Sequence, residues 1–490
     1  MADILGRYIA HEIPRYGVYS RIGAESTPPG YTFAAKGVTF DGDGIVMQKG
    51  RTKLNSSAAF SGGRITAGFD MQNPDGRQEI LCGSGKIAKI VNGTVTNLVT
   101  GRTTNAIERM RVFMGQGIFT NGFDPVIALT LNGGVTNLTT LGAPVSKCIE
   151  VYNNVCWLAH QPDGSNGPSV LQNSGTRDLS AWSVLNAYNI ESNNADVIHA
   201  LFKLGGYLAI GKEDSITFLR GNFFDQTSSS YDAYVLPPFT GGGVLCPMVA
   251  YDRFGRALYF NEGGFWLHSA VDVAPKHLSN CIHPDIKRIN LGRADEMSIV
   301  HIPQEMEFRV SVPVGGVFEQ WRYIYRPECL KNGVGAWFME PWTNHSALWG
   351  FEASLDETFP RAGDTSGFAQ KLDDSWSDNG SDYTNFCEAS NIRGRGSQYD
   401  NWTWVLATMD NTGQDVTMEC YPDDARDDPE TRTISCSDAQ NRLITEQEIP
   451  ITGTGRRMGL KFIGGGANKP WGLRELRLVS QADSYIDAGA

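Results

Sequence analysis

The chain has 490 residues, 41% of them hydrophobic and 20% charged, so it is long enough to bury a large core in two or three domains. This composition excludes a disordered or fibrous protein. The 42 basic and 54 acidic residues give a formal net charge of −12, which argues against tight DNA binding through a broad basic face. The 55 glycines and 22 prolines predict many turns between short strands, and so an all-β fold.

The sequence carries no recognisable signal for export. No apolar run reaches the length of a membrane span, and the segment MADILGRYIAHEIPRYG lacks the apolar stretch and cleavage site of a signal peptide. We therefore expect synthesis in the cytoplasm and no membrane anchor. The nine cysteines are scattered without a CxxC pair, which predicts buried thiols and neither disulfides nor a zinc site.

Residues 1–60 predict an N-terminal arm and a lead-in strand, and residues 61–375 predict a β-propeller. In the second range, alternating strand-like runs recur in groups of three or four, about 45 residues apart, as expected of propeller blades. Two successive groups end in VTNLV and VTNLT, each after an Asn-Gly turn. Separate β-sandwiches would show no such repeat, so we expect six or seven blades. The groups begin near Arg64, Arg109, Cys148, Val197, Val244, Met297 and Ala347.

The last group, near Ala347, contains only about three strands of its own. A propeller closes when a strand from the other end of the chain completes the last blade. We expect the strand from Val38 to Met47 to do this.

Residues 376–490 predict a C-terminal β domain that resembles a sandwich. A polar linker, WSDNGSDYTNF, is followed by alternating segments such as WTWVLATM, VTMECYP and RRMGLKFIGG. About five strands are expected, enough for a compact platform-like domain.

No motif in the sequence assembles a catalytic or metal site. The eight histidines show no HExxH or HxH spacing, and GxSxG and GxxxxGK[ST] are absent. Asp41-Gly42-Asp43-Gly44 and the Asp423–Asp428 run could offer oxygen ligands to calcium, but neither forms the 12-residue loop with a terminal Glu. We therefore predict no catalytic residues, no cofactor and no metal.

An enzyme reading would need paired carboxylates at the top of the propeller, as in propeller glycosidases. Tryptophans could form sugar-stacking platforms there, although aromatics at alternating strand positions more often fill the core between blades. The acids that could form such a pair are Glu213, Asp214, Asp252, Glu262 and Asp285. The tryptophans are Trp157, Trp182, Trp266, Trp321, Trp337, Trp342 and Trp349.

Nearly all the excess negative charge lies between Asp373 and Asp438, where 15 acidic residues face four arginines. We interpret this stretch first as a solvated, loop-rich acidic face. A second interpretation is that it lines a conduit, repels DNA and lets the DNA slide. Neutralising Asp423, Asp424, Asp427 and Asp428 should then increase DNA retention at low salt.

Several segments together resemble the propeller tail proteins of tailed bacteriophages, the nozzle or tail hub (stabilisation) proteins. The likeness covers most of residues 37–480, and each motif alone is unspecific; Leu179 stands where the family's loop has a proline. The segments are GVTFDGDGIVMQKGRTKL (37–54), NSGTRDLSAWSVL (173–185), GYLAIGKEDSITFLRGN (206–222), ALYFNEGGFWLHS (257–269) and GRRMGLKFIGGGANKPWGLRELRLVS (455–480).

This resemblance implies a structural virion protein without enzymatic activity. It would form a homohexameric ring that extends the DNA ejection conduit below the portal and adaptor, and would accept a tail needle, fibre or plug. Genomic DNA would pass through without tight binding. Two other classes stay open: a propeller that binds or cleaves glycans, and a WD-type scaffold, which the absence of Trp-Asp and Gly-His pairs disfavours.

Overall fold

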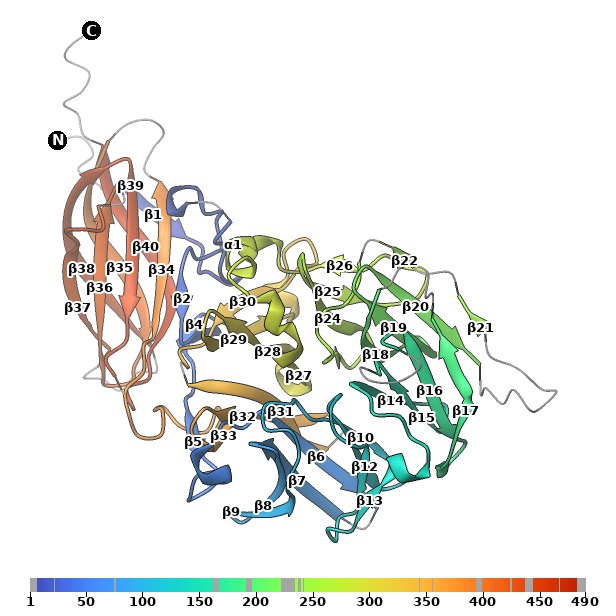
Figure 1. Cartoon of the computed structure of the whole chain (residues 1–490). Helices are drawn as coiled ribbons and strands as arrows, with labels where there is room; N and C mark the ends of the chain where they lie inside the picture. Colours follow the sequence, from blue (N-terminus) through green and yellow to red (C-terminus); the bar gives the residue numbers. More distant parts are fainter. Residues whose placement is uncertain are drawn as a thin grey trace, which may run out of the picture.

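In the residues that the computed structural model describes, seven β-sheets surround a central axis and form a β-propeller beside a β-sandwich (Figure 1). The predicted all-β fold is confirmed, and the blade count is seven. The structure describes residues 7–21, 23–74, 76–161, 167–190, 196–221, 234–236, 239–240, 242–342, 344–354, 356–393, 399–423, 425–436, 444–466 and 468–482.

Two-residue turns fix the first blades. Ser84-Gly85, Asn92-Gly93 and Met114-Gly115 have positive φ at both positions, which type I′ hairpins need because their twist matches that of the strands. Blade 1 comprises β6 (Ala67–Asn73), β7 (Gly76–Gly83), β8 (Lys86–Val91) and β9 (Thr94–Val99); blade 2, β10 (Arg109–Phe113), β11 (Gln116–Thr120), β12 (Ile127–Leu129) and β13 (Val135–Asn137); blade 3, β14 (Cys148–Tyr152), β15 (Val155–Ala159), β16 (Val170–Gly175) and β17 (Asp178–Asn189).

The later blades follow the same order, with the first strand of each nearest the axis. Blade 4 comprises β18 (Ile198–Leu204), β19 (Tyr207–Lys212), β20 (Ser215–Arg220), β21 (Tyr234–Val235) and β22 (Phe239–Thr240); blade 5, β23 (Ala250–Tyr251), β24 (Ala257–Asn261), β25 (Gly264–His268) and β26 (Lys276–His277); blade 6, β27 (Ser298–Ile302), β28 (Glu307–Val314), β29 (Val317–Ile324) and β30 (Ala336–Met339); blade 7, β31 (His345–Ser354), β32 (Glu357–Asp364) and β33 (Ala369–Leu372).

A short N-terminal strand, β5 (Arg51–Lys53), completes blade 7 by pairing antiparallel with β33. The prediction that the segment from Val38 to Met47 completes the last blade was therefore wrong. Residues 38–47 instead form the hairpin of β3 (Val38–Phe40) and β4 (Ile45–Met47), which joins the C-terminal domain through β40. The physical reason is burial: Val38, Phe40, Ile45 and Met47 all lie in the core of that domain.

Arg51 anchors this closing strand. Its side chain is 1% exposed, and its Nε and Nη2 donate to both carboxylate oxygens of Asp378 at 2.7 and 2.9 Å. The guanidinium also lies over the ring of Trp342, 4.9 Å from its centre. Blade 7 is thus tied to the segment that leads into the C-terminal domain.

Replacing Arg51 with methionine should lower the free energy of unfolding by about 2–3 kcal/mol, measured by urea unfolding at pH 7. Removing one partner of a buried ion pair commonly costs about 3–5 kcal/mol, but Asp378 is 26% exposed and water can partly rehydrate it. Lys53→Met, on the same strand but exposed, should change stability by less than about 0.5 kcal/mol. Equal losses in the two variants would contradict the anchoring role.

Apolar clusters lie between neighbouring blades, such as Phe69, Ile80 and Phe119 between blades 1 and 2. The contact between blades 6 and 7 differs, because its apolar cluster has only five buried residues. Beside it lies a buried ion cluster of Glu307, Arg309, Arg322, Glu340 and Asp373.

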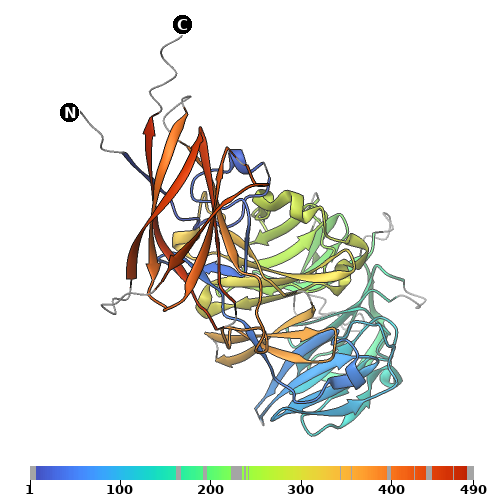
Figure 2. The same cartoon turned by 90° about the vertical axis from the view of Figure 1, so that its left-hand side faces the viewer.

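The C-terminal domain is a sandwich of two sheets, seen edge-on in Figure 2. The N-terminal segment does not stand apart as an arm, because its strands belong to this domain and to blade 7. One sheet contains β3, β4, β40 (Gly472–Ala482), β35 (Asp400–Asp410) and β38 (Ile444–Gly455), with β1 (Arg7–His11) beside β40. The other contains β34 (Phe386–Arg393), β39 (Arg457–Ile463), β36 (Asp415–Pro422) and β37 (Glu430–Ser435).

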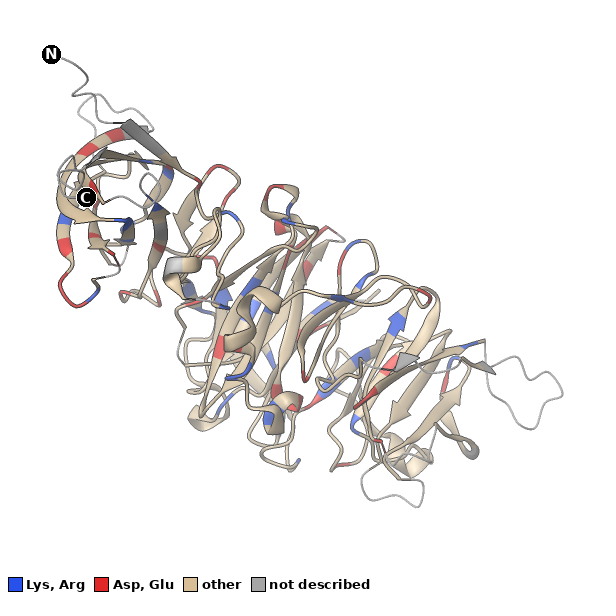
Figure 3. Cartoon of the chain, turned by 90° about the horizontal axis from the view of Figure 1, so that it is seen from above, with Lys and Arg blue, Asp and Glu red and all other residues tan. Residues whose placement is uncertain are grey.

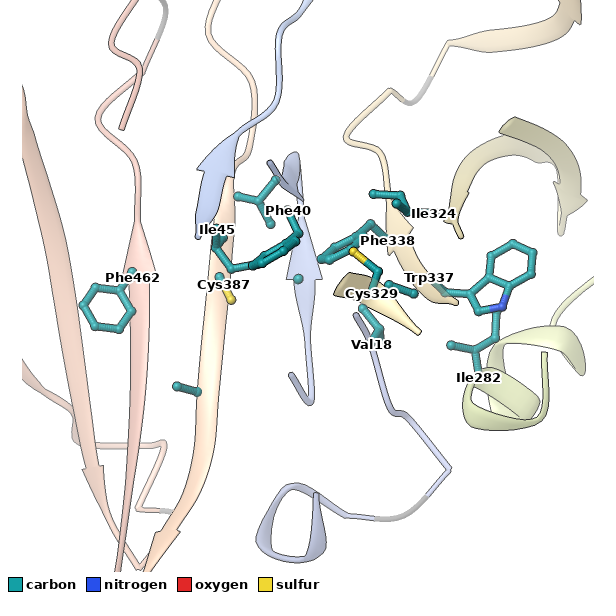
Figure 4. Close-up of a cluster of buried hydrophobic side chains, with 14 of the residues drawn as sticks. Val18, Phe40, Ile45, Ile282, Ile324, Cys329, Trp337, Phe338, Cys387 and Phe462 are labelled. Atoms are coloured by element: carbon teal, nitrogen blue, oxygen red, sulfur yellow. The ribbon is translucent and has the colours of Figure 1, made fainter. Parts of the chain in front are cut away.

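The second sheet of the sandwich is continuous with blade 6. β2 (Ala35–Lys36) pairs with β30 on one side and with β34 on the other, which gives one nine-stranded sheet. Figure 4 shows Phe40 and Ile45 between the propeller side, with Phe338, and the sandwich side, with Cys387. Propeller and sandwich therefore share a sheet and a core.

Helices are few and short in the part of the chain that the structure describes. None of them is long and apolar enough to cross a membrane. They are η1 (Ala24–Ser26), η2 (Ala59–Gly62), η3 (Leu138–Leu141), η5 (Asn280–Ile282), α1 (His283–Ile286), η6 (Leu291–Glu296), η7 (Pro303–Glu305) and η8 (Pro327–Cys329).

Candidate functional site

One mouth of the propeller channel is closed by η6. Arg109 begins β10 in blade 2, which lies nearly opposite blade 6, and its Nη2 donates to the carbonyl of Asp295 at 3.2 Å. Lys147, before blade 3, lies 3.2 Å from the Asp295 carboxylate, and Arg64, before blade 1, lies 2.6 Å from that of Glu296. These bonds hold η6 across the axis, so the channel does not run through the propeller.

The other mouth leads into a cavity of about 430 Å³ between the inner strands β6, β10, β27 and β31. Polar and charged residues lie toward the hairpin ends of these strands, and apolar residues line the deeper wall. The polar lining residues are Asp70, Gln72, Arg111 and Glu352; the apolar ones include Phe69, Met110, Val112, Met248, Val300, Leu348 and Trp349.

Charges of both signs follow one another around this mouth. Arg77 Nε donates to Asp70 at 2.7 Å, and the backbone N–H of Glu352 donates to the same carboxylate at 2.9 Å. Burial, and then the nearby Asp70, raises the pKa of Glu352. The carboxylates of Asp70 in blade 1 and Glu352 in blade 7 therefore lie beside each other at this mouth.

Blades 2, 3 and 4 carry a second group of charges near this mouth, of which Arg111 lines the cavity whereas Glu150 and Lys203 lie outside its lining. Arg111 Nε donates to Glu150 at 3.0 Å, and this carboxylate raises the pKa of the Arg111 guanidinium. Lys203 Nζ lies 3.9 Å from Glu150 and is 53% exposed. The lining residues Asp70, Gln72, Arg111 and Glu352 can therefore hold a small polar ligand at this mouth by hydrogen bonds.

One serine–histidine contact in the described residues looks like a catalytic pair but is not arranged as one. Ser279 Oγ lies 3.2 Å from His277 Nε2. That nitrogen also lies 3.1 Å from the carbonyl oxygen of Gly263, so it carries the hydrogen and donates to the carbonyl. It cannot take a proton from Ser279, which is itself buried and accepts the N–H of Phe265.

The carboxylates that the sequence suggested for a glycosidase pair do not converge. Asp252 binds Arg256 in the first hairpin of blade 5, and Asp285 binds Arg288 on α1. Glu213, Asp214 and Glu262 lie in turns of blades 4 and 5. None of the five lines the cavity.

Most of the suggested tryptophans belong to the core. Trp157, Trp321, Trp337, Trp342 and Trp349 are each less than 5% exposed, which confirms the core interpretation for these five. Trp266 stacks on His277 with ring centres 4.5 Å apart, and Trp182 packs against the cluster between blades 2 and 3. No sugar platform forms among them.

The aspartates suggested as calcium ligands bind other groups of the protein. Asp41 accepts the N–H groups of Asp43 and Gly44 and binds Arg474, while Asp423 accepts those of Arg456 and Arg457. The described ranges hold no group of three His, Cys, Asp or Glu that could bind a metal. Eight cysteines are buried, Cys281 is half-buried, and all nine are free thiols, as predicted.

The acidic stretch from 373 to 438 is not a uniform solvated face. Asp373 is half-buried and binds Arg309 and Arg322, and Asp378 holds Arg51. Solvent reaches Asp423, Asp427 and Asp428, whereas Asp424 lies outside the described residues. Figure 3 shows acidic and basic residues interspersed over both domains.

The mouth residues Asp70, Arg111, Glu150, Lys203 and Glu352 were missed by sequence reasoning. Their signal is positional: each lies close to the end of the first strand of its repeat, in AGFDMQN, RMRVF, CIEVY, IHALFKL and HSALWGFEAS. A charge at the same place in successive repeats marks the rim of a propeller channel, because these strands all surround the axis.

The sequence matches no protein-family model and no curated protein. Solved structures with a similar fold include the WD40 domain of Neurospora crassa Pan2, with 8% identity, 66% of this chain and 96% of that chain covered, and a TM-score of 0.42. BBS1N, in a complex with ARL6DN, shows 8% identity, 66% and 97% coverage and a TM-score of 0.40. BamB from Moraxella catarrhalis shows 11% identity, 69% and 98% coverage and a TM-score of 0.35. At these values the likenesses add nothing to the β-propeller fold that the strand pairing of this chain itself establishes.

Proposed function

We propose that this chain is a structural subunit of a bacteriophage tail, forming a homohexameric nozzle or hub ring below the portal and adaptor. The observation that carries the proposal is the nine-stranded sheet that joins blade 6 to the sandwich. With a shared sheet and core, the two domains can transmit force without hinging, which suits a ring that must stay closed while DNA is ejected. The sequence resemblance to tail propeller proteins supports the same role.

The closed channel mouth bears on where DNA would run. Because η6 spans the axis, bound to residues from blades on the other side, the conduit would lie between the subunits of the ring and not inside a propeller. A net charge of −12 and the exposed Asp423, Asp427 and Asp428 would let DNA slide without sticking. A needle, fibre or plug would dock at the free end of the tail, and the assembly would form in the host cytoplasm before it is part of the virion.

A second candidate function has one observation in its favour. The 430 Å³ cavity has a polar rim and an apolar wall, which is the usual construction of a small-ligand site. A propeller that binds glycans at this mouth is therefore the alternative. The suggested carboxylates do not meet there, so binding and not cleavage is the form this alternative takes.

Light scattering and negative-stain imaging of the purified chain, alone and mixed with purified portal and adaptor, test the proposal. We expect six copies in a ring, either alone or stacked below the portal. A monomer that stays unchanged at all concentrations and with both partners would contradict it. Glycan-array binding that Arg111→Ala abolishes would then support the alternative.

A further inference from the structure

An exposed tryptophan lies on the outer face of the first sandwich sheet, on β35, the strand next to the edge strand β38. Trp404 on β35 is 42% exposed, next to a bulge in the pairing with both neighbouring strands. It stands opposite Pro450 on β38, which is exposed, and Val479 on β40, which is buried, so the exposed apolar surface consists of Trp404 and Pro450. We call this surface, with the residues around it, the Trp404 face.

Acidic residues flank the Trp404 face on the side of Leu406 and Thr408. Along β38 the outward positions before Pro450 are Glu446 and Glu448, both exposed. On β40, Glu475 and Arg477 point outward and bind each other at 2.6 Å. The surface is therefore an apolar centre with net negative charge beside it, which is the composition of a protein–protein contact.

A surface of opposite character lies on blade 5. The hairpin between β23 and β24, residues 252–256, carries Phe254 at its tip, 64% exposed. Arg253 and Arg256 lie over its ring, 5.0 and 5.3 Å from the centre. Arg256 is matched by the buried Asp252, whereas Arg253, apart from the Phe254 ring, contacts the sulfur of Met306 at 3.8 Å. We call this segment the Phe254 hairpin.

The two surfaces cannot meet within one chain. Figure 1 places the sandwich and β24 on different parts of the molecule, with blade 6 between them, and the outer sheet face points away from its partner sheet. An apolar tip flanked by arginines matches an apolar face flanked by glutamates in both hydrophobic character and charge. Tryptophan and arginine are also the residues that most often dominate binding energy.

We propose that the Phe254 hairpin of a second copy of this chain packs on the Trp404 face. Such a contact joins two different surfaces, so each copy offers one and accepts one, and repetition closes a ring when the rotation between copies fits. This inference rests on the proposed function, which supplies the ring. It adds which two surfaces of neighbouring copies form the contact within that ring.

Cross-linking tests the contact directly in the full chain. A Phe254→Cys chain mixed with a Pro450→Cys chain should form a disulfide-linked dimer under mild oxidation, and neither variant should do so alone. The native thiols interfere little, because all but Cys281 are buried. Phe123→Cys, on a turn of blade 2 with the same 64% exposure, is the matched control and should not cross-link to Pro450→Cys.

Sedimentation velocity of single variants gives the second measurement. Phe254→Ser and Trp404→Ser should each weaken self-association at least roughly tenfold, whereas Phe123→Ser should leave it unchanged. Glu446→Lys with Glu448→Lys should weaken assembly, and Arg253→Glu added to these should restore it, since the charges are then exchanged.

Each remaining outcome overturns the contact. A six-membered ring that survives both serine variants, without the mixed cross-link, refutes this interface but leaves the tail-ring function standing. Rings that survive while binding to the adaptor is lost would assign the Trp404 face to the adaptor instead. A chain that stays monomeric with and without portal and adaptor refutes the contact and the proposed function together.

Discussion

Replacing Arg309 with methionine will lower the free energy of unfolding by about 3–5 kcal/mol, because it leaves buried carboxylates without their counterion. Arg309 is 0% exposed; its Nε donates to Glu307 at 2.7 Å and its Nη2 to Asp373. Arg322 alone would then face three carboxylates from a distance of 3.1–3.3 Å. Urea unfolding followed by tryptophan fluorescence at pH 7 measures the change.

Arg288→Met is the matched control for this cluster. Arg288 also binds two carboxylates, Asp285 and Glu319, but it is 48% exposed, so its loss should cost less than about 1 kcal/mol. A loss of similar size in both variants would show that burial does not set the strength of the cluster. Arg309→Lys separates charge from geometry, since lysine keeps the charge but cannot bind two carboxylates side by side.

The partners of this cluster could not be predicted from the sequence. Asp373 opens the acidic stretch, for which the sequence predicts a solvated face, yet its partners Arg309 and Arg322 lie more than 50 residues earlier. Local charge counts cannot see such a partner, because blade 6 and the end of blade 7 meet only in the closed propeller. Few apolar residues lie between blades 6 and 7, so the hydrophobic pattern of the sequence does not indicate this contact either.

The blades themselves could be predicted because their signals are local. Alternating apolar residues and turns such as Asn92-Gly93 specify each hairpin without distant partners. The closing strand could not be predicted this way. Arg51–Lys53 has no apolar residue, since a strand at the outer edge of a blade needs backbone pairing more than a core face, whereas the apolar hairpin 38–47 fits the sandwich core.

The sequence could predict the kind of candidate site, but not the residues that form it. A propeller with a polar rim follows from the repeat, but the residues that form it do not include the carboxylates singled out first. Asp252 and Asp285 are not available to a ligand, because each binds an arginine close to it in the sequence, Arg256 four residues later and Arg288 three residues later. Charged positions compared across repeats, such as Arg111 and Glu150, would have located the mouth.

The second large effect is acid unfolding between pH 6.5 and pH 4. His345 is 0% exposed in blade 7, and burial, with the nearby Arg51 and Arg64, lowers its pKa to about 3. Burial likewise lowers the pKa of His11, His199 and His301 to about 4 each. Because these folded values lie below the ordinary 6.5, the unfolded chain binds more protons in this range, and stability falls as pH falls.

The expected loss is large because several groups act together. One pKa unit corresponds to about 1.4 kcal/mol, so His345 alone can contribute roughly 4 kcal/mol between pH 6.5 and pH 3. Total stabilities of domains are commonly about 5–15 kcal/mol. We therefore expect urea midpoints to drop steeply from pH 6.5 to pH 4 and to change little from pH 7 to pH 8.

His345→Gln isolates one contribution to this slope. Glutamine cannot take up a proton, so the variant should lose less stability than the parent chain between pH 6.5 and pH 4, whatever its stability at pH 7. The control is His283→Gln, at a half-buried position at the start of α1. This variant should keep the dependence of stability on pH that the parent chain shows. If the slope of His345→Gln equals that of the parent, the buried histidine does not drive the acid transition, and His11, His199 and His301 become the candidates.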